Sequence, residues 1–552
     1  MNRRDLIVTS RLGPQAAPPR GSLGAYNRRN DPMKERLPLL SLRTFLAILA
    51  TFLLSIASAQ SPAPQPELSP AQAERDGQAD HAKSSATPKV CVACIRAEMS
   101  FLASDALRGR GSGTPDELLA ATYVAAQLEQ YGVAPAGDDR TYIQRATVVR
   151  QTLSAPLQLH FMTPGDGIPA QTIVWTHGKE MLALRLSQTD FRGPLKRASA
   201  EQLLAGTDAT SRAGAKASDN ADKPLAGKFV LLAGKDRKTI ESAANEAIEA
   251  GAVAVMVPAS PTVLDGWTER GKQLPKLPAK VEGDGAALEL SNLNVFALNP
   301  EALNSLKEIP DGTMFWLEAS VGPMEKSHTW NAVGKIEGRD PAMRKDVILL
   351  TAHLDHLGVG APVNGDSIYN GADDDASGTV AVLELARVLA KGPRPKRTVI
   401  FALFGSEEEG GLGSTWFEAH PPVPISRIVA NLEFEMIGRP DPKYPPDTLW
   451  LSGWERTNLG PTLAEHGAKL VEDERPEEHF FERSDNYVLA RKGVVAQTAS
   501  SFGLHNDYHQ PSDDLAHINF KHMTTVIGSL IGPIEWLVNS SFTPEWKAGR
   551  RP

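Results

Sequence analysis

The chain contains very little cysteine. Its two cysteines among 552 residues, Cys91 and Cys94, form a single C-x-x-C pair. A structural zinc site of the paired-cysteine kind needs four ligands, and the sequence has no second cysteine pair to complete one. The pair follows a polar segment rather than a strand of a βαβ unit, which argues against a thioredoxin-like redox motif. We therefore expect a local disulfide or two inert thiols.

The chain also has no excess of positively charged residues. Lysine and arginine together number 58 against 66 acidic residues, and the formal net charge is -8. The short basic cluster 394–397 contains a proline and no aromatic residue. No basic surface for a phosphate backbone is indicated, so we expect no nucleic-acid partner. Hydrophobic residues make up 41% and charged residues 22%, as in soluble globular proteins.

The N-terminal region lacks an apolar run long enough to cross a bilayer. Its apolar segment, Thr44–Ile56, is shorter than the roughly 20 residues that a spanning helix needs. A basic segment from Met33 precedes it, and the small-x-small sequence of residues 57–59 follows it. These are the parts of a signal peptide. We expect a protein exported to the periplasm or secreted, without a stable membrane span after cleavage.

The length predicts more than one folded domain, because 552 residues exceed what one hydrophobic core usually organises. Apolar residues at helical spacing over 95–107 and 117–131 begin the folded part, and residues 227–258 predict a compact strand-helix-strand unit. The expected segments are a non-native N-terminal extension (1–32), a signal peptide (33–59), a flexible linker (60–90), the first part of the main domain (91–154), an inserted domain (155–325), the second part of the main domain (326–540) and a C-terminal tail (541–552).

The fold class follows from the strands of the second part. The segments 347–352 and 398–404 are continuous apolar runs, and they alternate with helical segments such as 378–389. Strands without polar alternation are buried on both faces, which is typical of a largely parallel sheet covered by helices. We predict an α/β protein with a mixed, largely parallel sheet, whose chemistry lies at the carboxyl ends of its strands.

Candidate ligand residues occur at those predicted strand ends. They are His353 and Asp355 after the first strand, Glu407 and Glu408 after the second, and Glu435 after the segment 428–434. Three aspartates, 373–375, open the intervening helix, where acids can also serve only as N-caps. Gathering so many carboxylates at one edge would cost several kcal/mol without a cation. Imidazole and carboxylate without thiolate suit zinc, and two metals can act together as a hydrolytic clamp.

Five sequence blocks occur in an order that resembles a known family. They are H-L-D (353–355), N-G-A-D-D-D-A-S-G (370–378), E-E-E-G-G-L-G-S (407–414), F-E-M-I-G-R (434–439) and Y-H-Q-P-S-D (508–513). Together they resemble the co-catalytic zinc aminopeptidases of the aminopeptidase and glutamate carboxypeptidase superfamily. The similarity covers about 95–150 and 325–540, and 155–325 resembles a protease-associated domain. The resemblance implies the α/β/α sandwich of the zinc exopeptidases, which is phosphorylase/hydrolase-like.

The same resemblance implies two zinc ions per chain and a role for each matching residue. His353 and Glu435 would hold one zinc, and Glu408 and His509 the other. Alignment on Ser377 and Gly378 assigns the bridging carboxylate to Asp374 rather than Asp373, with a cis peptide bond between Asp374 and Asp375. Asp355 would orient His353, and Asp485 and Asp513 would support the site.

The implied reaction is removal of an N-terminal residue from a peptide with a free amino terminus. Glu407 would act as the general base toward a metal-bridging water, and Tyr508 would donate to the developing oxyanion. A carboxypeptidase, a glutaminyl cyclase of the same fold and a receptor-like binding protein without catalysis are the alternatives. The preferred side chain, the role of the inserted domain and the oligomeric state do not follow from the sequence.

Overall fold

The computed structural model describes residues 89–163, 171–211, 223–283 and 294–552. The predicted signal peptide and nearly all of the predicted linker lie outside these residues. Within them, no helix is both long enough and apolar enough to cross a membrane.

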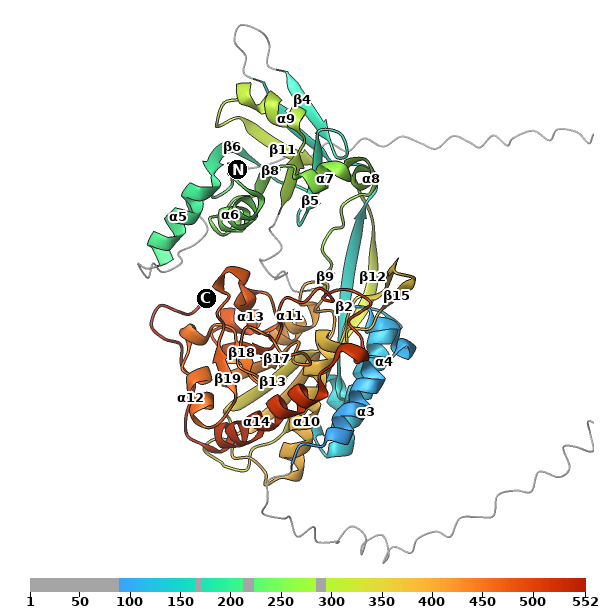
Figure 1. Ribbon diagram of the computed structural model, residues 1–552, viewed down its shortest axis with the longest axis vertical. Coiled ribbons are helices and arrows are strands. Elements are labelled where there is room, and N and C mark those ends of the chain that lie inside the picture. The colour runs from blue at the N-terminus through green and yellow to red at the C-terminus, as the bar shows by residue number, and fades with distance from the viewer. Residues whose placement is uncertain (1–88, 164–170, 212–222, 284–293) are drawn as a thin grey trace, which may run out of the picture. The chain divides into compact units, whose positions relative to one another are not determined.

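A ten-stranded mixed sheet forms the larger body (Figure 1). Its strand order is β19-β18-β20-β17-β13-β16-β12-β2-β9, and β1 pairs with β12. The central strands β16, β13, β17 and β20 run parallel, as the sequence predicted. Strands β12 and β18 pair with them antiparallel, and the edge strand β19 runs parallel to β18. The bounds are β1 Ala134–Pro135, β2 Ile143–Leu153, β9 Lys280–Val281, β12 Val321–Ile336, β13 Val347–His353, β16 Thr398–Phe404, β17 Ile428–Phe434, β18 Leu449–Leu451, β19 Leu470–Glu472 and β20 Val495–Ser500.

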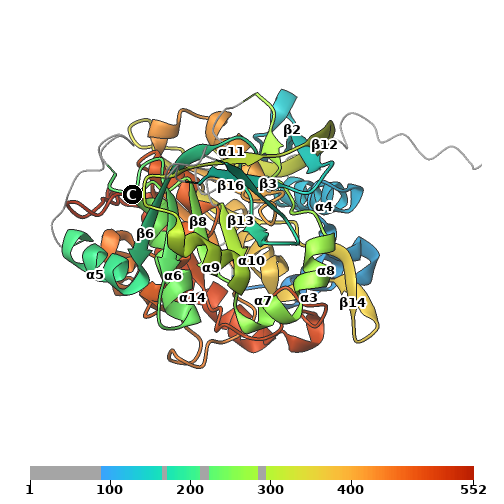
Figure 2. The ribbon, with the colours of Figure 1, turned by 90° about the horizontal axis from the view of Figure 1, so that it is seen from above.

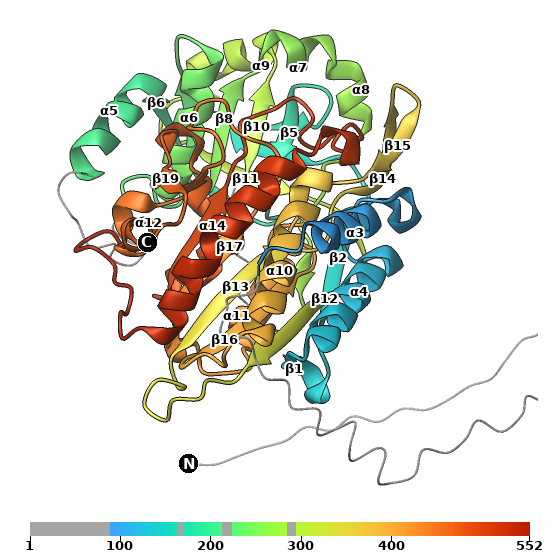
Figure 3. The same ribbon diagram turned by 60° about the horizontal axis from the view of Figure 1, so that its bottom comes forward.

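Both faces of this sheet are buried, which explains why its central strands lack polar alternation. Along β13, Ile348 and Leu350 pack into one apolar cluster, while Val347 and Leu349 pack into another on the opposite face. The first face is covered by helices that include α3 (Val92–Leu102), α4 (Pro115–Tyr131), α10 (Gly378–Lys391) and α14 (Phe520–Asn539), as Figure 3 shows. The second face is covered by α11 (Leu412–Ala419) and α13 (Asn486–Arg491).

The two predicted N-terminal helices are present, and three of their four boundaries differ from the predicted ones. Helix α4 ends where predicted, because Gly132 adopts the left-handed conformation (φ 82°) that closes the helix. Helix α3 ends at Leu102, five residues earlier than predicted. Leu107 is still buried, but in a short 3₁₀ segment (Asp105–Arg110) rather than the helix. Cys91 and Cys94 form a disulfide at the start of α3.

A second sheet of eight strands lies in the predicted inserted segment, in the order β4-β3-β11-β6-β7-β8-β10-β5. Figure 2 shows α6 (Arg237–Glu249) beside β8, where its alanines pack on the sheet. The strand-helix-strand unit predicted over 227–258 is therefore confirmed. The strands are β3 Gln158–Met162, β4 Thr172–Thr176, β5 Met181–Arg185, β6 Arg192–Ser199, β7 Phe229–Ala233, β8 Ala254–Pro258, β10 Val295–Leu298 and β11 Met314–Glu318. The domain boundaries remain a prediction, and β9 from within the segment pairs with β2 of the larger sheet.

Candidate metal centre

Parallel pairing brings the predicted site residues to one edge of the larger sheet. His353 is the last residue of β13 and lies in register with Phe404, the last residue of β16. On the other side of β13, Thr351 pairs with Glu433 of β17. The residues that follow these strands therefore leave the sheet at the same edge, as expected for parallel strands.

A compact cluster forms there around Asp374. One carboxylate oxygen of Asp374, Oδ1, lies 3.1 Å from Nε2 of His353, and the other, Oδ2, lies 3.3 Å from Nε2 of His509. The same His509 nitrogen is 3.1 Å from Oε2 of Glu408. Asp374 thus stands between two histidines that are 156 positions apart in the printed sequence. This is the arrangement that a bridging carboxylate requires.

The three consecutive aspartates face different partners. Asp373 accepts the backbone N–H of Gly438 at 2.7 Å. Asp375 accepts the N–H of Gly378, the first residue of α10, at 2.9 Å and that of Met436 at 3.0 Å. Asp374 is left to face the histidines. The Asp374–Asp375 peptide bond is cis, as the resemblance implied.

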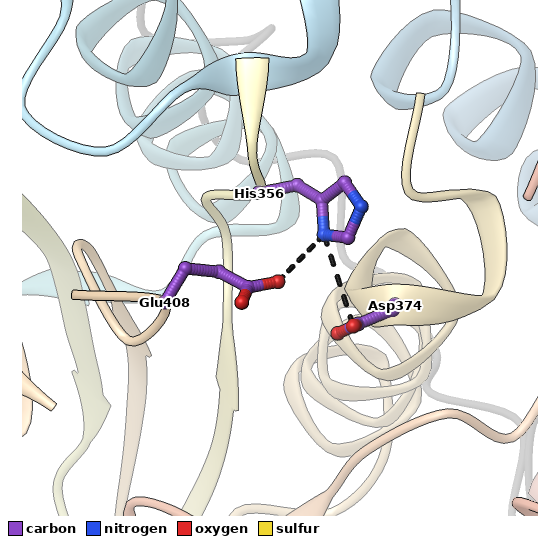
Figure 4. A group of neighbouring side chains, drawn as sticks. All are labelled: His356, Asp374 and Glu408. Atoms are coloured by element: carbon purple, nitrogen blue, oxygen red, sulfur yellow. Dashed lines mark ion pairs between the residues drawn. The ribbon is translucent and has the colours of Figure 1, made fainter. Parts of the chain in front are cut away.

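The sequence interpretation did not include His356, which the structure places in the cluster. Figure 4 shows its ring directed toward Glu408 and Asp374, with Nδ1 at 2.7 Å from Oε1 of Glu408 and 3.8 Å from Oδ2 of Asp374. One ligand atom from each of these three residues lies within 4.8 Å of the others, and these atoms could hold a metal ion. The sequence feature that could have indicated His356 is its position three residues after His353, at the end of a predicted strand.

Several buried polar atoms of the cluster make no hydrogen bond. They are both ring nitrogens of His353 and of His356, Nε2 of His509 and Oε1 of Glu408. Nδ1 of His356 lies 2.7 Å from Oε1 of Glu408, and Nε2 of His353 and of His509 each lie 3.1 Å from a carboxylate oxygen of Asp374 or Glu408, but these contacts do not form hydrogen bonds. Buried polar atoms are nearly always paired. Imidazole nitrogens and carboxylate oxygens that converge without pairing fit a bound divalent cation such as zinc.

The electrostatics of the cluster also fit a cation. Burial opposes a charge on His509, but the carboxylates of Asp374 and Glu408 outweigh this effect and raise its pKa to about 10. Burial also lowers the pKa of His353, but the carboxylates of Asp355 and Asp374 outweigh it. The pKa of His353 therefore lies well above its usual range. Positive charge is therefore strongly favoured at this point. A metal ion would supply that charge in place of the protons.

Glu407 and Glu435 face a pocket beside the cluster. Its wall includes Asp374, both glutamates and Tyr508, together with the apolar side chains of Met436, Trp450, Phe480 and Phe502 and the cation of Arg483. Burial raises the pKa of Glu407 well above its usual range, although His353 opposes this shift. Within the described ranges no hydrogen bond or ion pair joins Glu435 to His353 or Asp374, so Glu435 is brought to the pocket but less closely to the cluster than the other predicted ligands.

Tyr508 stacks on His509, with ring centroids 3.8 Å apart. Burial and the neighbouring carboxylates raise the pKa of its phenol. The phenol therefore keeps its proton near neutral pH and can donate a hydrogen bond in the pocket.

The three predicted supporting acids hold the loops of the site. Asp355 accepts the N–H of Glu407 at 3.0 Å, and its Oδ1 lies 3.6 Å from Nδ1 of His353 without forming a hydrogen bond. Asp513 accepts the N–H groups of both Asp373 and Asp374. Asp485 accepts the hydroxyl of Ser414.

Arg110 is a further support that sequence reasoning left without a role. Its guanidinium is completely buried and donates to the carbonyls of Leu102, Leu354, Asn370 and Gly371. Two of these carbonyls belong to the loop before the aspartates, and one follows His353 directly. The signal for it lay in the glycine-rich segment 109–113, where glycines allow the backbone to approach closely.

Known proteins to which this chain is similar include peptidases. An aminopeptidase of Pseudomonas aeruginosa (strain UCBPP-PA14) is 30% identical over 257 residues, covering 46% of this chain and 43% of that protein. A probable zinc metalloprotease of Pyrenophora tritici-repentis is 43% identical over 108 residues, covering 20% of this chain and 22% of that protein. The chain thus spans less than half the length of these curated relatives.

Among solved structures, the aminopeptidase from Aneurinibacillus sp. strain AM-1 aligns with a TM-score of 0.47 at 18% identity, covering 83% of this chain and 96% of that one. The family model described as Peptidase family M28 matches residues 331–531, which include every residue of the cluster. Residues 331–531 are therefore similar to peptidase family M28.

Proposed function

We propose that the protein is a zinc-dependent aminopeptidase that removes N-terminal residues from peptides. The observation that carries this proposal is the convergence of unpaired, buried imidazole and carboxylate atoms at strand ends within the segment that is similar to peptidase family M28. The P. aeruginosa relative, which is named an aminopeptidase, supports the substrate class.

Two metal positions share Asp374 in this proposal. His353, with Glu435 from the pocket wall, would hold the first zinc, and Glu408 with His509 would hold the second. The contacts of Asp374 with His353 through one oxygen and with His509 through the other support this division. Bound zinc would polarise the scissile carbonyl and lower the pKa of water.

The protein's own side chains would then handle the protons. Glu407 lies in the pocket wall beside Asp374, where its buried carboxylate can take a proton from the attacking water and pass it to the leaving amine. Tyr508 keeps its phenol proton and can donate to the oxyanion. Apolar walls around Trp450 and Phe502 exclude water from the reacting bond.

Exchange of Glu407 tests this assignment. Glu407→Gln should lower kcat by roughly 10²–10⁴-fold, because general-base catalysis contributes about that much, while zinc content stays unchanged. Glu409→Gln is the matched control, because Glu409 pairs with Arg150 instead of facing the pocket. Zinc analysis and aminoacyl-anilide hydrolysis measure both effects. Wild-type turnover by the Glu407→Gln variant would refute the mechanism.

A carboxypeptidase is the second candidate, and one residue favours it. The side chain of Arg483 lies in the pocket wall, where a cation could bind the terminal carboxylate of a substrate. Aminoacyl anilides with a free amine and N-blocked dipeptides with a free carboxylate separate the two activities. Faster hydrolysis of the N-blocked dipeptides, lost in Arg483→Gln, would establish a carboxypeptidase in place of an aminopeptidase.

A further inference from the structure

The backbone of His356 is fixed on both sides. Its N–H donates to the carbonyl of Arg110 at 3.1 Å, and its own carbonyl accepts the N–H of Ser112 at 3.2 Å. Because the chain between residues 110 and 112 also carries the buried Arg110 guanidinium, this anchor is rigid. The side chain of His356 leaves the strand end in a direction set by the fold.

The ring of His356 is fixed as well. It is fully buried and packs against Gly371, where a Cβ atom would lie 2.5 Å from Cγ of His356. Gly371 has a positive φ of 58° and lies three residues before Asp374. The close packing aims Nδ1 of His356 at Glu408 and Asp374, as Figure 4 shows.

Both ring nitrogens of His356 are buried without a hydrogen-bond partner. Nδ1 nevertheless lies 2.7 Å from Oε1 of Glu408 and 3.8 Å from Oδ2 of Asp374. A cation placed among these three atoms would satisfy all of them, because an imidazole nitrogen and carboxylate oxygens can each act as a ligand.

We propose that His356 is a fourth protein ligand of the metal held by Asp374, Glu408 and His509, an inference that rests on the metal-dependent function proposed above. Four protein donors would fill a zinc site of the structural kind, whereas His353, Asp374 and Glu435 would supply only three. A metal held with His356 would therefore be released more slowly than one held at His353, and the three-donor position would be the one accessible to substrate.

A role in which His356 only orients Glu408 predicts something different. Residues that hold a ligand in place typically change metal affinity by about 10–100-fold when removed and leave the coordination sphere intact. A direct ligand changes the coordination number itself. The number of nitrogen donors around the metal therefore separates the two roles independently of hydrolytic activity.

The experiment uses the full chain loaded with zinc or cobalt(II), in the wild type, His356→Ala and His356→Gln. Metal release into excess EDTA is followed, together with the visible absorption of the cobalt forms. The wild type should release one metal rapidly and the other slowly. Both variants should release the second metal more than ~100-fold faster, beyond the range of an orienting residue, and their cobalt absorption should change.

His505→Gln is the matched control. His505 contacts Asp373 of the same acidic run at 3.1 Å but not the cluster, so its exchange should leave the slow phase within a few-fold of the wild type. A slow phase and a cobalt spectrum in His356→Ala that match the wild type would overturn the ligand assignment while leaving the proposed function intact. A wild type that binds neither metal and hydrolyses no substrate would overturn the proposed function itself.

Discussion

The two sheets use the polar residues at their strand ends differently. In the second sheet, the polar residues after three parallel strands are N-caps: Asp236 accepts the N–H of Thr239, Ser260 that of Val263 and Asn299 that of Ala302. In the larger sheet, the histidines and Glu408 at the corresponding ends keep buried atoms without hydrogen bonds. Both sheets contain parallel strands followed by helices.

The difference shows which property marks a site in this molecule. Polar residues at strand ends are common to both sheets, and helix capping accounts for those of the second. At the strand ends of the larger sheet, side-chain nitrogen and oxygen atoms instead lie close together, and several of them have no hydrogen-bond partner. Three exchanges test how far this distinction extends.

The largest expected effect is at Arg110. Its guanidinium donates hydrogen bonds to backbone carbonyls in the loops of the larger sheet, which are not N-capped like the helices of the second sheet. Arg110→Met would leave four buried carbonyls without their donor. We expect a loss of about 3–5 kcal/mol in stability, since breaking a buried network leaves polar groups unpaired. Thermal unfolding measures it. The exposed Arg108, two residues earlier, is the control, and Arg108→Met should cost less than about 0.5 kcal/mol.

Glu98 tests whether a buried acid with one unpaired oxygen behaves like the cluster. Its Oε1 accepts the hydroxyl of Tyr131, whereas its Oε2 has no hydrogen-bond partner. Burial raises its pKa to about 7; the Tyr131 hydrogen bond and the cation of Arg387 oppose this shift, and repulsion from Glu384 adds to it. Between about pH 4.5 and 7 the folded state holds a proton that the unfolded state releases, so stability falls as pH rises through this range.

Glu98→Gln removes that dependence. The variant should equal the wild type near pH 4.5 and exceed it by on the order of 3 kcal/mol above pH 7, which corresponds to the shift in pKa. Melting temperatures across this pH range measure the difference. Glu129→Gln, on an exposed face of α4, is the control. A constant offset between Glu98→Gln and the wild type at all pH values would contradict the prediction.

The smallest effect is expected in the second sheet. Asp236→Ala removes the cap of α6 and should cost about 1 kcal/mol, with zinc content and turnover unchanged. Differential scanning calorimetry and an aminopeptidase assay measure the two quantities. Loss of bound zinc in this variant would show that the second sheet also contributes to the metal site.

Continuous apolar runs predicted the central strands β13, β16 and β17 closely, because burial on both faces leaves a clear pattern in the sequence. The end of α3 was predicted less well. The chain turns at Arg108, Gly109 and Arg110, all of which have positive φ, and local periodicity does not report such a turn.

The candidate site was predicted in part. His353, Asp374, Glu408 and His509 meet in the structure, since each follows a strand or belongs to a sequence block. His356 was missed because its role depends on packing against Gly371 and on the loop at Arg110, which are distant in sequence. The pocket wall at Trp450, Phe480 and Phe502 was missed for the same reason, because separate loops contribute its members.

The disulfide between Cys91 and Cys94 has a practical consequence, because it uses both cysteines of the chain. An oxidised sample offers no thiol to a maleimide reagent. A cysteine introduced at Ser484, in the pocket wall, would therefore be the single attachment point for a fluorophore or spin label. Substrate entry could then be followed optically, without competition from a native thiolate for the metal.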